Sequence, residues 1–288
     1  MLNSDSFALT LSCPNQPGLV SVVSSCLYEA SGNITEAQQH DDTITGRFFM
    51  RVVFTLQDRA RHKALMFANM EKIAKQYQMN WHITDRTRKK RVLIMVSRFD
   101  HCLVDLLYRW RIGELIMDIA GIIANHPKEL YAHIDMQEVP FYYLPITPET
   151  KTTQEEKLQS IIEETQADLV ILARYMQVLS SNLSQKLIGH CINIHHSFLP
   201  GFKGAKPYHQ AFERGVKLIG ATAHFVTSDL DEGPIIEQDV TRVTHSDTPA
   251  DFIRKGRDIE RRVLAQAVRD YIQDRIILNG SKTVVFGD

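Results

Sequence analysis

The 288-residue chain lacks the features that mark a membrane, secreted or nucleic-acid-binding protein. It has no uninterrupted run of 18 apolar residues, and no basic segment followed by an apolar one at its start, so neither a membrane span nor a secretion signal is predicted. Lys plus Arg (33) nearly balance Asp plus Glu (34), which leaves no net field to attract an anionic membrane or a nucleic acid. We therefore expect a cytoplasmic protein that binds neither.

Cysteine is also scarce, and its spacing excludes two further classes. The four cysteines are widely separated and form no C-x-x-C pair: Cys13, Cys26, Cys102 and Cys191. This spacing argues against a disulfide framework and against a thiolate zinc site, and it favours reduced thiols. What the chain does have is 44% hydrophobic residues and a length typical of about two domains.

A pattern of short strands and helices in the order βαββαβ occupies the first 85 residues. Alternation of apolar and polar residues predicts a strand at 7–13, which ends at the turn sequence P-N-Q-P-G. The other expected elements are a helix from Leu19 with a C′ glycine at Gly32, a hairpin of residues 34–40 and 47–56, a helix carrying Met66, Met70, Ile73 and Tyr77, and a strand at 81–84. This order predicts an α+β sandwich.

The βαββαβ order, the Pro-rich turn and the G-L-V sequence that opens the first helix together resemble the ACT domain. The resemblance implies a regulatory or oligomerisation domain over residues 1–85 and an amino-acid effector bound there. A unit that only mediates subunit contacts remains the alternative. In either case we expect self-association, as a homodimer or a homotetramer.

The rest of the chain predicts a doubly wound α/β domain over residues 92–288, after a basic linker at 86–91. Buried strands are expected at 92–96, 119–123, 141–144, 169–173 and 192–195. A capping box at Thr153 to Glu156 predicts the start of one helix, and another is expected from Pro249 to about Ile277. The charged residues of the last helix, Glu260 among them, are expected to form its solvated face. Alternating strands and helices favour a mostly parallel sheet.

Three polar residues near one edge of that sheet form the candidate site. Asn193 and His195 are two residues apart at the end of a strand, so their side chains point to the same side. Asp231 follows 36 positions after His195, directly before a Gly-Pro turn. Each residue alone is typical of a turn or an edge. Together, an amide, an imidazole and a carboxylate can stabilise a developing oxyanion and transfer a proton.

The motifs around these residues resemble the folate-dependent formyltransferase family. They read N-I-H-H-S-F-L-P-G-F-K-G at 193–204, G-A-T-A-H-F-V at 220–226 and L-D-E-G-P-I-I at 230–236. The resemblance implies a 10-formyltetrahydrofolate substrate, no separate cofactor, and Asn193, His195 and Asp231 as catalytic residues. It also implies a pterin pocket near Arg174, Tyr175, Met176 and Gln177.

Four further residues have open roles. His224 either shapes the pocket or satisfies the core. Leu103 and Leu107 either line the pocket or belong to the core. His196 stands where related transferases usually carry proline, so the sequence assigns it no role.

The acceptor of the formyl group follows from the loop after the first strand of this domain. Family members that act on a phosphorylated amine have a glycine-rich loop there, whose backbone N–H groups bind phosphate. This chain has S-R-F-D-H-C at 97–102 and no glycine until Gly113. Water is therefore the expected acceptor, and the expected reaction yields tetrahydrofolate and formate, which feeds one-carbon and purine metabolism.

Three alternatives remain from the sequence. Arg98 and His101 would bind an anion by side chain if the enzyme were instead a transferase. A non-catalytic amino-acid sensor would release no formate. A metal hydrolase would use histidines, but no H-E-x-x-H or H-x-x-x-H pattern joins His195, His196, His209 and His224, so no metal is expected.

Overall fold

A computed structural model describes residues 6–201 and 207–287 of the chain. The motif residues Phe202, Lys203 and Gly204 lie outside the described residues. The backbone separates into two compact units, and residues 273–279 and 284–287 group with the first unit instead of the second. This differs from the expected division, which placed every residue after the linker in the catalytic domain.

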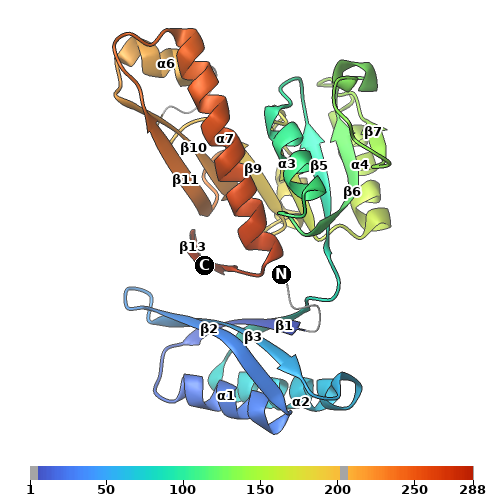
Figure 1. Ribbon diagram of the computed structural model, residues 1–288, viewed down its shortest axis with the longest axis vertical. Coiled ribbons are helices and arrows are strands. Elements are labelled where there is room, and N and C mark those ends of the chain that lie inside the picture. Colours follow the sequence, from blue (N-terminus) through green and yellow to red (C-terminus); the bar gives the residue numbers. More distant parts are fainter. Residues whose placement is uncertain (1–5, 202–206, 288) are drawn as a thin grey trace. The chain divides into compact units, whose positions relative to one another are not determined.

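The first unit is an antiparallel sheet with two helices. Its elements are β1 (Ser6–Pro14), α1 (Leu19–Glu29), β2 (Gly32–Asp42), β3 (Arg47–Leu56), α2 (Arg59–Tyr77) and β4 (Asn80–Asp85). The strand order is β2-β3-β1-β4, and α1 and α2 cover one face of the sheet (Figure 1). The predicted βαββαβ order and the hairpin are therefore confirmed.

The helix-covered face of this sheet holds the core of the first unit. Alternate residues of β1 and β3 pack against the helices, as period-two alternation requires. The main contributors are Phe7, Leu9, Leu11, Met50, Val52 and Phe54 from the strands and Val23, Leu27, Met66 and Met70 from the helices. One local prediction was wrong: α1 ends at Glu29, and the left-handed residue after it is Ser31, with φ 54°. Gly32 begins β2, and a Cβ there would lie 2.8 Å from the carbonyl oxygen of Leu27.

Arg51 explains why the carboxyl-terminal residues belong to the first unit. Its side chain is fully buried on the sheet face opposite the helices. Nε donates to the carbonyl oxygen of Asp274 and Nη2 to that of Gln273, both at 3.0 Å, and Nη1 pairs with Glu36 at 2.6 Å. A buried guanidinium needs such partners. The segment after the last long helix therefore provides the hydrogen-bond acceptors for Arg51 of β3.

The second unit is a seven-stranded α/β sheet. Its elements are β5 (Lys90–Val96), α3 (His101–Arg111), β6 (Met117–Ala124), the 3-10 helix η1 (Lys128–Tyr131), β7 (Phe141–Tyr143), α4 (Lys151–Thr165), β8 (Leu169–Leu172), α5 (Ser181–Lys186), β9 (Cys191–His195), α6 (Pro207–Arg214), β10 (Leu218–Phe225), β11 (Ile235–Arg242) and α7 (Pro249–Ile272). The strand order is β11-β10-β9-β8-β5-β6-β7. Pairs from β9 to β7 are parallel, while β10 and β11 are antiparallel, so the mostly parallel α/β prediction is confirmed.

The last long helix, α7, covers one part of this sheet. In Figure 1, α7 lies along β9, β10 and β11, against which it packs. Across the described ranges, 6–201 and 207–287, no helix has the length and apolar character to cross a membrane. Two short strands, β12 (Ile276–Asn279) and β13 (Lys282–Val285), pair after α7.

Two predicted helix boundaries in the second unit were wrong. The expected capping box does not start α4, because the helix already begins at Lys151, and Thr147 and Thr150 hydrogen-bond each other in the preceding turn. The last helix ends at Ile272, before the predicted end, because Asp274 adopts a left-handed φ of 54° that an α-helix does not accommodate.

Candidate active site

β9 and β10 bring the first polar residues of the site together. Asn193 and His195 lie at the carboxyl end of β9, which runs parallel to β8 inside the sheet. β10 runs antiparallel beside it, and its register places His224 directly opposite Asn193. Opposed residues of paired strands have their side chains in contact range on the same face. The sequence predicted the Asn193 and His195 pair, and strand pairing adds His224.

A tight return of the chain brings Asp231 to the same place. After β10, the backbone N–H of Phe225 donates to the carbonyl oxygen of Pro234 at 2.9 Å, which closes the loop against the strand end. A Cβ at Gly233 would lie 1.7 Å from the carbonyl oxygen of Phe225, so only glycine fits there. Asp231 itself has a left-handed φ of 57°. This backbone conformation is uncommon outside glycine and often marks functional sites.

The four side chains form one hydrogen-bonded cluster. His195 Nδ1 lies 3.2 Å from Asp231 Oδ1, and His224 Nε2 lies 3.7 Å from the same oxygen. Asn193 Nδ2 lies 3.2 Å from His224 Nε2. The other ring nitrogen of His224, Nδ1, donates to the carbonyl oxygen of Phe225 at 2.9 Å. Since Nδ1 of neutral His224 carries the proton, its Nε2 accepts from the amide of Asn193, which sets the orientation of that amide.

The electrostatics of the cluster favour an ionised Asp231. Burial opposes ionisation of Asp231, but the hydrogen bond from His195 and the adjoining imidazole of His224 outweigh it and hold the pKa of this carboxyl well below its usual range. The resulting carboxylate accepts a hydrogen bond from Nδ1 of His195. Nε2 of His195 is buried and has no hydrogen-bond partner among the described residues. That nitrogen is therefore available to a substrate or a water.

A small cavity of about 60 Å³ adjoins the cluster. Its walls include Asn193, His224 and Asp231, together with Gln177 from the loop after β8. The predicted pterin segment thus supplies one side chain to the same cavity as the predicted catalytic residues. Such a volume suits a water or a formyl group and not a whole folate.

The remaining residues of the predicted pterin segment lie elsewhere. Met176 is 51% exposed and lines a second cavity of about 380 Å³ with Arg174. Tyr175 is buried in the hydrophobic core, where Gln154 donates to its hydroxyl oxygen at 2.7 Å. Leu103 and Leu107 are fully buried on α3, which agrees with the core role that the sequence left open.

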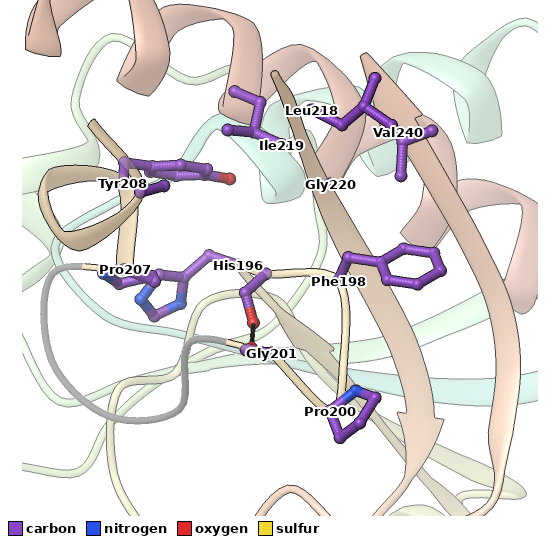
Figure 2. A pocket seen from close by; sticks show the side chains of 12 residues that line it. His196, Phe198, Pro200, Gly201, Pro207, Tyr208, Leu218, Ile219, Gly220 and Val240 are labelled. Carbon is purple, nitrogen blue, oxygen red and sulfur yellow. Dashed lines mark hydrogen bonds between the residues drawn. The ribbon is translucent and has the colours of Figure 1, made fainter. Parts of the chain in front are cut away.

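A third cavity, of about 450 Å³, has mainly apolar walls (Figure 2). It lies between the residues after β9, the helix α6, the strand β10 and the edge strand β11. Figure 2 shows His196 and Tyr208 on one side of it and Phe198 and Val240 on another. His196 and Tyr208 also line the second cavity, so this pair of rings borders both spaces.

Glu260 is the functional candidate that the sequence analysis missed. We expected it on the solvated face of the last helix, and this was wrong: it is 1% exposed. Its carboxylate accepts from the Tyr208 hydroxyl at 2.6 Å, meets His101 Nε2 at 2.8 Å, and lies 3.3 Å from Arg174 Nε. These hydrogen bonds and charges outweigh burial and lower the pKa of Glu260 to about 2. The helical spacing could have indicated this burial, because Glu260 lies four residues after the buried Gly256 and therefore on the same face of the helix.

Gly256 shows how α7 accommodates this buried group. A Cβ at that position would lie 2.1 Å from the Tyr208 ring. The missing side chain lets the ring approach the helix, and its hydroxyl reaches Glu260 one turn further on. Tyr208 in turn keeps its proton, because burial and the neighbouring carboxylate raise the pKa of its hydroxyl far above the usual range.

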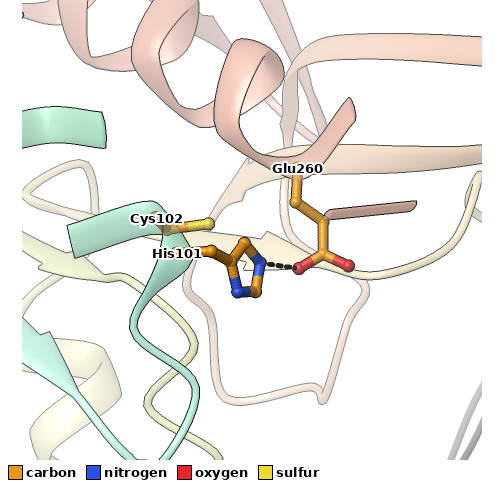
Figure 3. Close-up of side chains that lie close together, drawn as sticks. All are labelled: His101, Cys102 and Glu260. Atoms are coloured by element: carbon orange, nitrogen blue, oxygen red, sulfur yellow. Dashed lines mark hydrogen bonds and ion pairs between the residues drawn. The ribbon is translucent and has the colours of Figure 1, made fainter. Parts of the chain in front are cut away.

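His101, Cys102 and Glu260 also offer donor atoms within 4.8 Å of one another (Figure 3). A metal-bound thiol must lose its proton, but burial, and then the Glu260 charge, raise the pKa of Cys102 well above its usual value. Arg174 already provides the cation beside Glu260. The donor set therefore suits a guanidinium better than a metal ion, and the absence of a metal stays a prediction.

The loop after β5 is the segment from which the sequence predicted that water accepts the formyl group. Ser97 is buried, with its N–H donating to the carbonyl oxygen of Arg174 at 3.3 Å and its own carbonyl oxygen accepting from Tyr131 at 3.0 Å. His101 is held by Glu260, so its Nε2 is engaged. Arg98 is exposed. The loop is thus occupied by side chains and their partners, as the sequence predicted, and one of the two suggested anion ligands is already bound.

Comparisons with known proteins agree with this geometry. The model of the formyl transferase family matches residues 90–268. Formyltetrahydrofolate deformylase of Synechocystis sp. is 48% identical over 278 residues, which cover 96% of this chain and 97% of that protein. The crystal structure of formyltetrahydrofolate deformylase from Burkholderia mallei has a TM-score of 0.91 at 53% identity, covering 98% of this chain and 100% of that one.

A more distant structure shows how far the transferase likeness extends. Glycinamide ribonucleotide transformylase 1 from Symbiobacterium toebii has a TM-score of 0.63 at 28% identity. It covers 69% of this chain but 95% of its own, so this protein has a substantial part beyond the shared fold. The deformylases, in contrast, match over nearly the full length of both chains. The chain therefore belongs to the formyltetrahydrofolate deformylase family.

Proposed function

We propose that this protein hydrolyses 10-formyltetrahydrofolate to tetrahydrofolate and formate. The observation that carries the proposal is the hydrogen-bonded cluster of Asn193, His195, His224 and Asp231. All of its members except His195 line a cavity large enough for a formyl group. Full-length similarity to deformylases supports the same reaction. The reaction transfers no electrons, so the folate is its substrate and no further cofactor is needed.

Asn193 stabilises the negative charge that develops on the formyl oxygen. Its amide carries two N–H donors, and His224 accepts one of them. The second donates to the oxyanion when water adds to the formyl carbon. Because the amide is already oriented before the substrate arrives, little reorganisation is needed in the transition state.

His195 and Asp231 handle the proton of the attacking water. Asp231 keeps the proton of His195 on Nδ1, which leaves Nε2 as the base. When Nε2 takes a proton from water, the carboxylate stabilises the imidazolium. The C–N bond then breaks, formate leaves, and the pair returns a proton to N10 of the folate.

The direct test is formate release from 10-formyltetrahydrofolate by the purified protein, with and without an amine acceptor such as glycinamide ribonucleotide. We expect equal formate in both cases and no formylated amine. Formation of a formylated amine would support a transferase, and no turnover at all would support a sensor.

A variant pair connects the test to the cluster. We expect Asn193→Ala to lower turnover about 10²–10³-fold, the usual effect of losing one oxyanion donor. Asn182→Ala is the matched control, because Asn182 is an exposed asparagine on α5, and we expect it to stay within about twofold of the parent. A folded Asn193→Ala variant with parental turnover would contradict the assigned role.

For the first unit, we propose an ACT-like regulatory role. The βαββαβ order and the antiparallel sheet support the ACT likeness, and an amino acid is the proposed effector. We propose a homodimer or a homotetramer, and a cytoplasmic location, where the four buried free thiols would stay reduced. Light scattering tests the assembly, and formate release in the presence of each amino acid tests the effector.

A further inference from the structure

The ring of His195 is fixed from two directions. His196, the next residue, stacks against it, with ring centroids 5.2 Å apart and ring planes inclined by 29°. Asp231 holds the Nδ1 edge at 3.2 Å. The orientation of Nε2, the nitrogen proposed to meet the water, therefore depends on His196 as well as on the carboxylate.

Arg174 determines which nitrogen of His196 carries the proton. Its Nη1 contacts Nδ1 of His196. A guanidinium only donates, so Nδ1 accepts and the ring proton lies on Nε2. Burial, and next the charge of Arg174, lower the pKa of His196 to about 3, so the ring is neutral near pH 7.

A neutral neighbour matters to His195. A second imidazolium stacked on the ring would oppose its protonation, which the hydrolysis requires. The contact with Arg174 keeps His196 from becoming that cation. The same contact thus preserves the ability of His195 to accept a proton.

Arg174 is held in place by Glu260. The Nε–carboxylate distance is 3.3 Å, and Glu260 is 1% exposed. Tyr208 and His101 use the remaining acceptor positions of the carboxylate. Moving Arg174 away would leave a buried anion without its guanidinium, which is strongly unfavourable. The ion pair with Glu260 therefore restrains Arg174, which in turn contacts His196.

His196 also borders two cavities. It lines both the cavity of about 450 Å³ and the cavity of about 380 Å³. Since Arg174 occupies Nδ1, the N–H at Nε2 is the donor that the ring has left for water. The ring of Tyr208, with its centroid 6.1 Å away, borders the same spaces.

We propose that His196 is a positioning residue for the hydrolytic step. Held as the Nε2–H tautomer by Arg174 and Glu260, it keeps the His195 ring in its catalytic orientation and offers a hydrogen bond to water beside it. This inference rests on the proposed deformylase activity and assigns a role to a residue that the sequence left without one.

Kinetics of three variants test the proposal. His196→Leu keeps volume but loses both nitrogens, and we expect kcat to fall about 10–100-fold with KM changed less than about threefold, the effect of a misplaced reacting group. His196→Asn keeps an acceptor for Arg174 and an N–H donor, and we expect it to recover part of kcat. His245→Leu is the control, because His245 is an exposed histidine that lines none of the three cavities described above, and we expect parental kinetics.

The tautomer is tested on the parent protein, which needs no variant to fold. In histidine-labelled protein, ¹⁵N NMR should show His196 protonated at Nε2 and unprotonated at Nδ1 from pH 5 to 8. The groups that face this ring are Arg174, Glu260, His195, Asp231 and Tyr208. Protonation at Nδ1, or titration within this range, would overturn the proposal.

The outcomes separate this inference from the deformylase assignment. If the parent releases formate and His196→Leu has parental kcat, the positioning role is wrong and the assignment stands. If the parent releases no formate under any condition, both are wrong. A lowered kcat that His196→Asn partly restores, with the expected tautomer, supports the role.

Discussion

Replacing Glu260 by glutamine removes the charge at the centre of the buried network on α7. The pKa of Glu260 is about 2 in the folded protein, against an ordinary value of 4.5. A tenfold change in a protonation constant corresponds to about 1.4 kcal/mol, so the charged form contributes about 3 kcal/mol to the free energy of unfolding at pH 7. We expect Glu260→Gln to lose this amount, a fall in Tm of roughly 6–12 °C for a unit of this size.

The pH dependence gives the prediction a sign. A carboxyl whose pKa is lowered by folding stabilises the fold above its unfolded pKa, and that stabilisation is lost as pH falls through the folded value. The window here runs from about pH 4.5 down to about 2. The difference between parent and variant should therefore shrink from about 3 kcal/mol at pH 7 to about 2 kcal/mol at pH 3.5.

Urea unfolding at a series of pH values measures this difference. Glu164→Gln is the control, because it removes the same charge from an exposed position of α4, and its effect should stay within about 0.5 kcal/mol. A Glu260→Gln variant as stable as the parent at pH 7, or a difference that grows as pH falls, would refute the reasoning.

Three other substitutions probe separate features. Asp231→Asn should lower turnover about 10²–10⁴-fold and move the acidic limb of the pH–rate profile to lower pH, because the imidazolium of His195 loses its neighbouring anion. Glu232→Gln is the control, and an unchanged profile in Asp231→Asn would remove Asp231 from the mechanism. Gly233→Ala should cost more than about 4 kcal/mol in thermal unfolding, since its Cβ would lie 1.7 Å from a carbonyl oxygen of β10, whereas Gly287→Ala should be neutral. Arg51→Met should destabilise the first unit by about 2–4 kcal/mol in urea, because two partly buried carbonyl oxygens after α7 lose their donor. Parental stability would contradict that role.

Features set by local rules were predictable from the sequence. The period of two along a strand places Asn193 and His195 on one side, and strand-helix alternation predicts the parallel sheet that carries them. The Gly-Pro turn after Asp231 marks where the chain reverses. Burial of Leu103 was compatible with its spacing, but the spacing alone left two roles open.

Features set by contacts between distant residues were not predictable. The spacing of Glu260 from Gly256 places it on the buried face of α7, but its partners Tyr208, His101 and Arg174 are all far away in sequence. In the sequence, Arg51 is likewise only a cation in a strand. The structure shows that the residues after α7 provide the acceptors for its side chain.

The sequence by itself determined that the chain has an α+β unit followed by a larger α/β unit, that the larger unit has a mostly parallel sheet, and which residue types form the reactive cluster. Each of these follows from neighbours a few positions apart. Only the tertiary structure decided that His224 orients Asn193, that Arg174 turns toward His196, and that the end of the chain packs with the first unit. The physical reason is that a buried polar group must find its partner wherever the fold provides one, and that partner leaves no periodic signal in the chain.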